Sequence, residues 1–347
     1  MKTFAAILVE TGRPLVLDEL DVPALRSGQV LVRILHSGVC HTQLLECRGH
    51  RGPDRWVPHC LGHEGSGVVL EAGPNVTKVA AGDRVILSWM RGSGIEAGGT
   101  VYAWNGRGVN AGPITTFSRE AVLSENRLTK LPAGVDLRDA ALLGCALPTG
   151  MGAVVNAAGV RAGQSVAVFG AGGVGLCAIA GAALSGAHPV IAIDLVPAKL
   201  ALARELGATA AIDAGKENPT EAVAKHVPGG VDVAIEATGR PDVMAAALSV
   251  VRARGGSAVV VGNARHGERI SLDPWQLNQG KRLLGTWGGD TDPDRDFPRY
   301  AALVASGRLS LSALRKSYRL EDVETALADL EAGRVARPIL DMADGSA

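Results

Sequence analysis

The sequence predicts an α/β protein in which a β-rich N-terminal domain precedes a doubly wound parallel sheet. Three observations support this fold class. Up to about residue 145, short apolar runs alternate with turn signals and helical periodicity is weak. After Pro148, strand-length apolar runs alternate with helical stretches, as parallel sheets require. The 347 residues include 45 glycines and few aromatics, which favours two α/β cores over one helical bundle.

The N-terminal elements are expected to be strands joined by tight turns. Apolar runs at 30–35, 67–71 and 83–88 have strand length. Ser-Gly, Gly-Pro-Asn and Ala-Gly-Asp sequences between the runs are turn signals. The sequence therefore predicts an irregular β-domain over this part.

The second half is expected to alternate strands and helices. The predicted strands are 166–169, 190–194, 211–213, 231–236 and 257–261, and the predicted helices are 176–186, 197–207, 221–226 and 242–252. The polar, proline-containing segment 288–299 is expected to cross the surface without regular structure, before a helix at 321–333 and a strand at 338–342. We therefore expect domains at 1–147 and 148–287, with 288–347 returning to the first.

Composition argues against several classes of partner. Lys plus Arg and Asp plus Glu both number 35, so nucleic acid and anionic membranes are not expected as partners. No apolar run is long enough to span a membrane, and Glu10 interrupts any signal-peptide core. The five cysteines are scattered along a long chain, which favours reduced thiols and a cytoplasmic protein.

A glycine-rich string follows the predicted strand 166–169 and opens a predicted helix. The string is Gly170-Ala171-Gly172-Gly173-Val174-Gly175, a G-x-G-x-x-G in the context that dinucleotide binding requires. Asp194 ends the next predicted strand, where its carboxylate would accept the ribose hydroxyls of NAD and repel a 2′-phosphate. Its alternative role is to cap the helix 197–207. The combination predicts an NAD site.

Three potential metal ligands lie far apart in the chain. Cys40 and His63 stand in Gly-containing strings, and Cys145 follows Gly144. Taken singly, each cysteine is better explained as a small buried hydrophobic residue, and His63 as a surface or capped residue. Spacing alone does not join the three, because catalytic zinc ligands need not be neighbours in sequence.

Five ordered strings resemble the zinc-containing medium-chain alcohol dehydrogenases over essentially the whole chain. They are GVCHT, GHEGSGVV, GDRV, GCALPTG and VAVFGAGGVGL. The resemblance implies an N-terminal GroES-like β-barrel catalytic domain, a Rossmann domain and a C-terminal return. It also implies hydride transfer between a small alcohol or carbonyl substrate and NAD, and a homodimer or homotetramer.

The resemblance assigns the chemistry to particular residues. Cys40, His63 and Cys145 would hold one catalytic Zn²⁺, and Glu64 behind the metal would enter its coordination shell transiently. Thr42 would hydrogen-bond the substrate hydroxyl and take its proton.

The cofactor residues follow in the same way. His41 and Arg337 match positions at the pyrophosphate, while Thr149, Val174 and Asn263 match positions at the nicotinamide.

Two further positions match the edges of the site. Lys199 would lie near the adenosine ribose beside Asp194. Trp89 would line the substrate pocket, or serve as an ordinary core aromatic.

Three departures from the family pattern stand out. Residues 89–116 contain no cysteine, so we expect no structural zinc. Gln43 stands where the family has an aspartate as partner of His63. Leu45 replaces the histidine that often ends the proton relay, which leaves water or His50 as the route.

Rival functions follow from the same residues. A zinc-free quinone or enoyl reductase would lack the Cys40, His63 and Cys145 set, and a polyol or sugar dehydrogenase would carry a glutamate in place of Cys145. Oxidation of a thiol adduct, as in formaldehyde detoxification, stays open, and a non-enzymatic binding protein is the remaining alternative. Metal analysis and a substrate panel would separate these.

Overall fold

The computed structural model describes residues 1–343. It divides into two compact units, one made of Met1–Cys145 with the chain from Asp292 onward, the other of Ala146–Thr291. The chain thus passes between units at 145/146 and 291/292, whereas the sequence placed the boundaries at 147/148 and 287/288.

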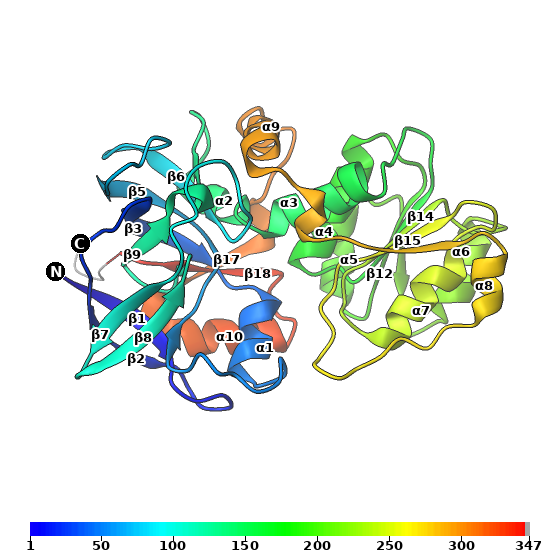
Figure 1. The fold of residues 1–347 in the computed structure, drawn as a ribbon. Helices are drawn as coiled ribbons and strands as arrows, with labels where there is room; N and C mark the ends of the chain where they lie inside the picture. Colours follow the sequence, from blue (N-terminus) through cyan, green and yellow to red (C-terminus); the bar gives the residue numbers. More distant parts are fainter. Residues whose placement is uncertain (344–347) are drawn as a thin grey trace. The chain divides into compact units, whose positions relative to one another are not determined.

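The first unit contains a closed β-barrel (Figure 1). Around the barrel the strands are β1 (Lys2–Leu8), β2 (Val16–Asp21), β7 (Thr100–Trp104), β8 (Arg107–Gly112) and β4 (His59–Cys60). Ile7, Leu20, Tyr102 and Val109 fill its core and are almost completely buried. The barrel confirms the predicted GroES-like class.

The strand ends next to the candidate site residues belong to a second sheet in this unit. Its order is β10 (Leu128–Lys130), β6 (Arg84–Ser88), β5 (Glu64–Ala72), β3 (Gln29–Gly38), β18 (Arg337–Asp341) and β17 (Arg315–Arg319), with β9 (Glu120–Ser124) also paired to β3. The register sets Gly65 opposite Ser37, Gly38 opposite Ile339 and Glu64 opposite Ser88. The start of β5, the end of β3 and the start of β18 therefore meet at one end of the sheet.

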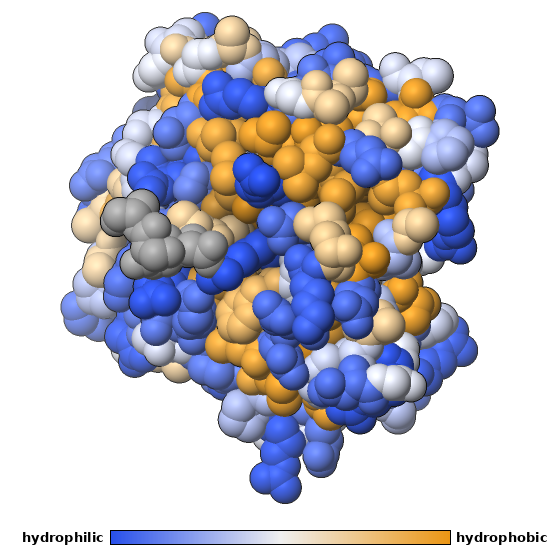
Figure 2. All heavy atoms as spheres, turned by 90° about the vertical axis from the view of Figure 1, so that its left-hand side faces the viewer, coloured by the Kyte–Doolittle hydropathy of each residue, from blue (hydrophilic) through white to orange (hydrophobic). Residues whose placement is uncertain are grey.

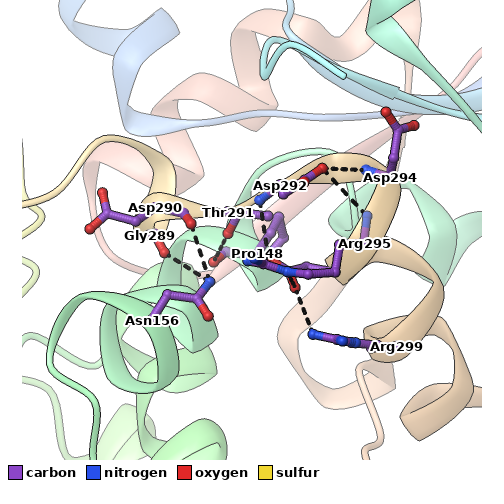
Figure 3. A network of polar contacts seen from close by, with 10 residues as sticks. Pro148, Asn156, Gly289, Asp290, Thr291, Asp292, Asp294, Arg295 and Arg299 are labelled. Atoms are coloured by element: carbon purple, nitrogen blue, oxygen red, sulfur yellow. Dashed lines mark hydrogen bonds and ion pairs between the residues drawn. The ribbon is translucent and has the colours of Figure 1, made fainter. Parts of the chain in front are cut away.

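Four α-helices belong to the described part of this unit: α1 (His41–Cys47), α2 (Leu137–Leu142), α9 (Pro293–Ala305) and α10 (Val323–Glu331). The helix α9 corrects the sequence prediction, which was wrong to treat 288–299 as an irregular crossing. Its start is fixed by Asp292, whose carboxylate accepts the N–H groups of Asp294 at 3.0 Å and Arg295 at 3.4 Å (Figure 3). Phe297 and Tyr300 bury one helix face, which the surrounding charges conceal in the sequence.

The residues just before α9 are held within the second unit. The Thr291 hydroxyl donates to the carbonyl of Pro148 at 3.0 Å. The Asn156 amide donates to the carbonyls of Gly289 and Asp290, both at 3.3 Å (Figure 3). These bonds explain why the chain leaves this unit only after Thr291.

The second unit is a parallel sheet with helices on both faces (Figure 1). The strand order is β13 (Ala210–Asp213), β12 (Val190–Asp194), β11 (Val166–Phe169), β14 (Val233–Glu236), β15 (Ser257–Val260) and β16 (Arg282–Gly285). The helices are α3 (Ala146–Gly152), α4 (Gly173–Leu184), α5 (Pro197–Glu205), α6 (Pro219–His226), α7 (Pro241–Val250) and α8 (Pro274–Asn278).

The side on which the chain adds successive strands to this sheet changes between β11 and β14. From β11 it steps outward through β12 to β13, and from β14 it steps the other way through β15 to β16. Right-handed crossovers then place α4 and α5 on one face and α6 and α7 on the other, and these pairs are in contact. The predicted doubly wound sheet is confirmed, and ligands bind such sheets at the reversal point.

The surface of the molecule is mixed in character. Figure 2 shows a face on which apolar residues form patches among hydrophilic ones. Within residues 1–343, no helix combines the length and the apolar character needed to cross a membrane.

Candidate active site

Three side chains of the first unit converge at the end of its second sheet. Cys40 lies between β3 and α1, His63 directly precedes β5, and Cys145 lies between α2 and α3. The two sulfur atoms and a ring nitrogen of His63 all lie within 4.8 Å of one another. Two cysteines and one histidine form the ligand set of catalytic zinc sites that keep a fourth position open.

A close backbone approach brings Cys145 to this position. A Cβ atom on the preceding Gly144 would lie 2.1 Å from the carbonyl oxygen of Leu87 and 3.0 Å from the Cα of Glu64. Only glycine allows the chain to pass so near β5 and β6. This is the physical reason for the glycine that the sequence places beside the ligand.

The buried nitrogen of His63 fits a metal. Within the described chain, His63 Nε2 has no hydrogen-bond partner. A buried polar atom without a partner is costly and calls for an explanation. A metal ion held between Nε2 and the two sulfurs supplies that explanation.

Charge around the cysteines favours the thiolate form that binds metals. Cys145 lowers the pKa of the Cys40 thiol well below its usual value, and Arg337 and His63 lower it further against the effect of burial. The adjacent Cys40 in turn raises the pKa of Cys145. One thiolate forms readily here, and the charge of a divalent cation would stabilise the second.

A buried ion pair lies directly behind the cluster. Arg337 Nε is 3.3 Å from Glu64 Oε1, and the side chains are 3% and 0% exposed. Burial alone would lower the pKa of Arg337, but Glu64 and the two cysteines outweigh it and raise the value. Arg337 Nη1 also donates to the carbonyl of Val39 at 3.3 Å. Its Nη2 atom is buried without a hydrogen-bond partner among the described residues.

The neighbours of the sulfur atoms include two predicted residues. Thr42 Oγ1 lies 3.8 Å from Cys40 Sγ. The indole N–H of Trp89 donates to Cys145 Sγ at 3.2 Å, and the Trp89 ring meets the His63 ring edge-on at 6.4 Å between centroids. Sequence reasoning weighed Trp89 as a pocket or core aromatic but missed this bond to a ligand sulfur, for which the sequence contains no signal.

Gln43 occupies the place beside His63. Its Nε2 lies 2.5 Å from His63 Nδ1, while its Oε1 accepts the backbone N–H of Cys40 at 3.1 Å. When His63 Nε2 binds a metal, Nδ1 carries the ring proton and needs an acceptor. The amide nitrogen of Gln43, a donor, faces Nδ1, and the single amide oxygen is already used by Cys40, whereas an aspartate has two acceptor oxygens.

Gln43 and His63 also line a cavity of about 840 Å³. Charged and aromatic side chains of α1, the following loop and β4 line it: Glu46, Arg51, Asp54, Trp56 and His59. The opposite wall comes from β7 and β8, including Val101, Asn110 and Ala111. The cysteine-free segment 89–116 thus forms a hairpin that borders the cavity.

In the second unit the glycine string adopts the expected turn. Gly170 has φ +91°, and Gly172 precedes the first residue of α4, which starts at Gly173 and not at 176 as predicted. A Cβ on Gly175 would lie 1.7 Å from the carbonyl oxygen of Gly170, whereas a Cβ on Gly172 would meet nothing within 4 Å. The first contact demands glycine for packing, and the second leaves open space at a helix N-terminus.

Asp194 lies beside that turn at the end of β12. One carboxylate oxygen accepts the N–H of Ala171 at 2.6 Å and the other accepts the N–H of Val196 at 2.9 Å. Asp194 and Gly170 line a cavity of about 460 Å³ with Thr238 and Arg240.

The other predicted cofactor residues are placed as follows. Thr149 is buried in α3, Val174 is half-buried in the first turn of α4, and Lys199 lies on α5. Asn263, after β15, and His41, the first residue of α1, are exposed. Among the described residues, Lys199 and Asn263 do not line the cavity that contains Asp194.

Comparisons with known proteins cover nearly the whole chain. Residues 26–133 match the family described as "Alcohol dehydrogenase GroES-like domain", and residues 173–306 match "Zinc-binding dehydrogenase". S-(hydroxymethyl)glutathione dehydrogenases of Synechocystis sp. and Photobacterium damsela subsp. piscicida are each 34% identical, over 98% of this chain and 100% of their own length.

Comparisons with solved structures agree with these sequence matches. The alcohol dehydrogenase zinc-binding domain protein from Burkholderia ambifaria has a TM-score of 0.92 and 34% identity. Benzyl alcohol dehydrogenase from Acinetobacter calcoaceticus has a TM-score of 0.91 and 30% identity. Both alignments cover 99% of this chain and 100% of the other. With the Cys-His-Cys cluster, these matches show that the chain belongs to the zinc-containing alcohol dehydrogenases of the medium-chain dehydrogenase/reductase superfamily, oxidoreductases that act on CH–OH groups.

Proposed function

We propose that this enzyme oxidises a small alcohol with NAD, or reduces the matching carbonyl, with one Zn²⁺ held by Cys40, His63 and Cys145. The observation that carries the proposal is the buried, unpartnered Nε2 of His63 between two sulfur atoms. Zinc bound there would polarise the substrate oxygen and lower the pKa of its hydroxyl.

The protein's own groups would manage the proton and the charge. Thr42 Oγ1, near Cys40 Sγ, would accept the substrate hydroxyl proton and pass on its own. The Trp89 N–H would draw electron density from Cys145 Sγ and fix its orientation. Glu64, held by Arg337, would supply a compensating negative charge behind the ligands.

NAD would supply the hydride acceptor. The open space at Gly172 and the N-terminus of α4 would admit a pyrophosphate, and Asp194 would accept the ribose hydroxyls. The buried Nη2 atom of Arg337, which has no hydrogen-bond partner in residues 1–343, supports its proposed role toward an anionic cofactor group. We propose contacts at the same cofactor for His41, Thr149, Val174, Lys199 and Asn263.

The names of the relatives support two substrate classes. The relatives named S-(hydroxymethyl)glutathione dehydrogenase are 34% identical, which favours a thiol adduct. The structural neighbour named benzyl alcohol dehydrogenase favours an aromatic alcohol. The cavity of about 840 Å³ has room for either, because it lies within the range of small-molecule pockets.

We also propose a homo-oligomer built on the second unit. Among the described strands, β16 pairs only with β15, so one edge of the parallel sheet is open. Trp275 and Leu277, which precede β16, are 62% and 48% exposed. An open strand edge beside exposed apolar side chains suits pairing with a second copy.

The test is NAD reduction by the zinc-loaded enzyme against alcohols, diols and thiol adducts, with metal content measured on the same sample. We expect activity with at least one class and loss of activity when a chelator removes zinc. Full activity of the metal-free protein would instead favour a zinc-free reductase.

A further inference from the structure

The cavity beside the metal ligands contains one carboxylate that nothing engages. Glu46 lines it together with Gln43 and His63, and its side chain is half-buried. Within the described chain, no hydrogen bond or ion pair involves its carboxylate.

The other carboxylate of the cavity serves as a contrast. Asp54 Oδ1 accepts the backbone N–H of Trp56 at 2.8 Å, and Oδ2 bonds to His59 Nε2 at 2.9 Å. Both Asp54 oxygens are therefore engaged in holding the loop. Glu46 has no comparable structural duty.

The helix α1 places Glu46 next to the proposed proton donor. Glu46 lies four residues after Thr42 and three after Gln43, so its side chain is a helix-surface neighbour of each of them. Side chains four apart on a helix have Cβ atoms about 5–6 Å from each other, a gap that a single water molecule bridges.

The two alternative routes, one on α1 and one beyond its end, are poorer. Leu45, at the position of the family's relay histidine, is 8% exposed and has no group that carries a proton. His50 lies beyond the end of α1, eight residues after Thr42.

We propose that Glu46 is the proton acceptor that follows Thr42. This inference rests on the proposed function. During oxidation the substrate O–H proton moves to Thr42 Oγ, the hydroxyl proton of Thr42 moves through one water to the Glu46 carboxylate, and the carbinol hydride moves to NAD. Alcohol and NAD⁺ thus give carbonyl, NADH and one proton, which Glu46 releases through the cavity to solvent.

The surroundings of Glu46 suit this exchange. Burial raises its pKa above the usual value for glutamate, and the charge of Cys40 adds to this. His63, Arg51 and His59 act in the opposite direction. A carboxylate with a pKa displaced toward neutrality both takes up and releases a proton efficiently near neutral pH.

The test compares single-turnover NADH formation in the parent, Glu46→Gln, Glu46→Asp and Asp54→Asn, across acidic to alkaline pH. The probe is the alcohol most active in the substrate panel. We expect Glu46→Gln to slow the turnover by about tenfold or more and to change its pH profile. Acetate or phosphate, added at constant ionic strength, should restore the rate of Glu46→Gln and leave the parent unchanged. Glu46→Asp should retain most of the rate, and Asp54→Asn should show no rescue.

Zinc content and NAD affinity are measured on every variant. A parent-like rate and pH profile in Glu46→Gln would overturn the proposal while leaving the proposed function intact. A slow Glu46→Gln that has lost zinc, or that no buffer rescues, would make Glu46 a structural residue and overturn it as well. A parent that reduces no NAD with any substrate would overturn the proposed function itself.

Discussion

Cys145 and Thr42 are proposed to act at the same metal in different ways. Cys145 would supply a charged sulfur, whereas Thr42 would supply only a hydroxyl, which lies 3.8 Å from Cys40 Sγ. We expect Cys145→Ala to lose or weakly hold zinc and to be nearly inactive. We expect Thr42→Val to keep zinc and lose about 10²- to 10⁴-fold in turnover.

Zinc content, NAD affinity and single-turnover hydride transfer, measured on both variants, check this pair of expectations. NAD affinity should survive in both, because the glycine string and Asp194 belong to the second unit. Full zinc and near-normal hydride transfer in Cys145→Ala would show that the metal site is misassigned.

The amide oxygen of Gln43 provides a second test, which concerns the affinity for zinc. Its one amide oxygen already accepts the N–H of Cys40, so a metal-bound His63 has no good acceptor for its Nδ1 proton. Gln43→Glu keeps the side-chain length and supplies two acceptor oxygens and a negative charge. We expect it to bind zinc about 10- to 100-fold more tightly.

Competition for zinc against a chelator of known affinity measures this change. Gln43→Leu, which removes both polar atoms, is the matched control and should not gain affinity. Equal or weaker zinc binding by Gln43→Glu would show that the amide already meets the needs of His63.

At the level of elements, two glycines in the turn between β11 and α4 have different roles. One is needed for packing, and the other leaves space for a ligand. A Cβ on Gly175 would collide with the carbonyl of Gly170, while one on Gly172, at φ −78°, would meet nothing. We expect Gly175→Ala to lower the free energy of unfolding by about 1–3 kcal/mol. Gly172→Ala should fold normally yet weaken NAD binding about tenfold, or 1.4 kcal/mol.

Denaturant unfolding and NAD titration distinguish the two variants. Normal NAD affinity in Gly172→Ala would place the pyrophosphate elsewhere. Normal stability in Gly175→Ala would mean that the helix can move away from the strand at little cost.

Asp194, at the end of β12, is proposed to set the choice of cofactor. Two unit charges about 4 Å apart at an effective dielectric near 20 repel by about 4 kcal/mol, so even after solvent screening Asp194 should favour NAD over NADP about tenfold or more. Asp194→Asn keeps an acceptor for a neighbouring backbone N–H but removes the charge, and it should relax the preference.

The kcat/KM values for both cofactors measure the preference. Asp213→Asn, at the register partner of Asp194 on β13, is the control and should leave the preference unchanged. Equal kcat/KM values in the parent would refute the role of Asp194.

For the whole molecule, the metal stoichiometry tests the missing cysteines. Segment 89–116 contains no cysteine and contributes the β7–β8 hairpin to the barrel and to the large cavity. We expect close to one zinc per chain in protein purified without chelator. Elemental analysis is the measurement, and a reproducible ratio near two would require a second site that does not depend on these thiols.

The sequence by itself determined the features that depend on local chemistry. Strand-length apolar runs and the glycine string predicted the parallel sheet and its turn, because a continuous apolar run and an absent Cβ act over a few residues. The order of five strings identified the family. The proposed roles of the individual site residues stay predictions.

Only the tertiary structure decided what depends on contacts between distant segments. Cys40, His63 and Cys145 converge because β3 and β5 pair with Ser37 opposite Gly65 and because Gly144 lets the chain pass close to both β5 and β6. The helix α9 forms because its apolar face is buried, which outweighs the proline and the charges in its sequence. The contacts of the Gln43 amide and the unengaged carboxylate of Glu46 are likewise set by three-dimensional neighbours. No spacing in a sequence records such neighbours, because hydrogen bonds and burial are decided by packing.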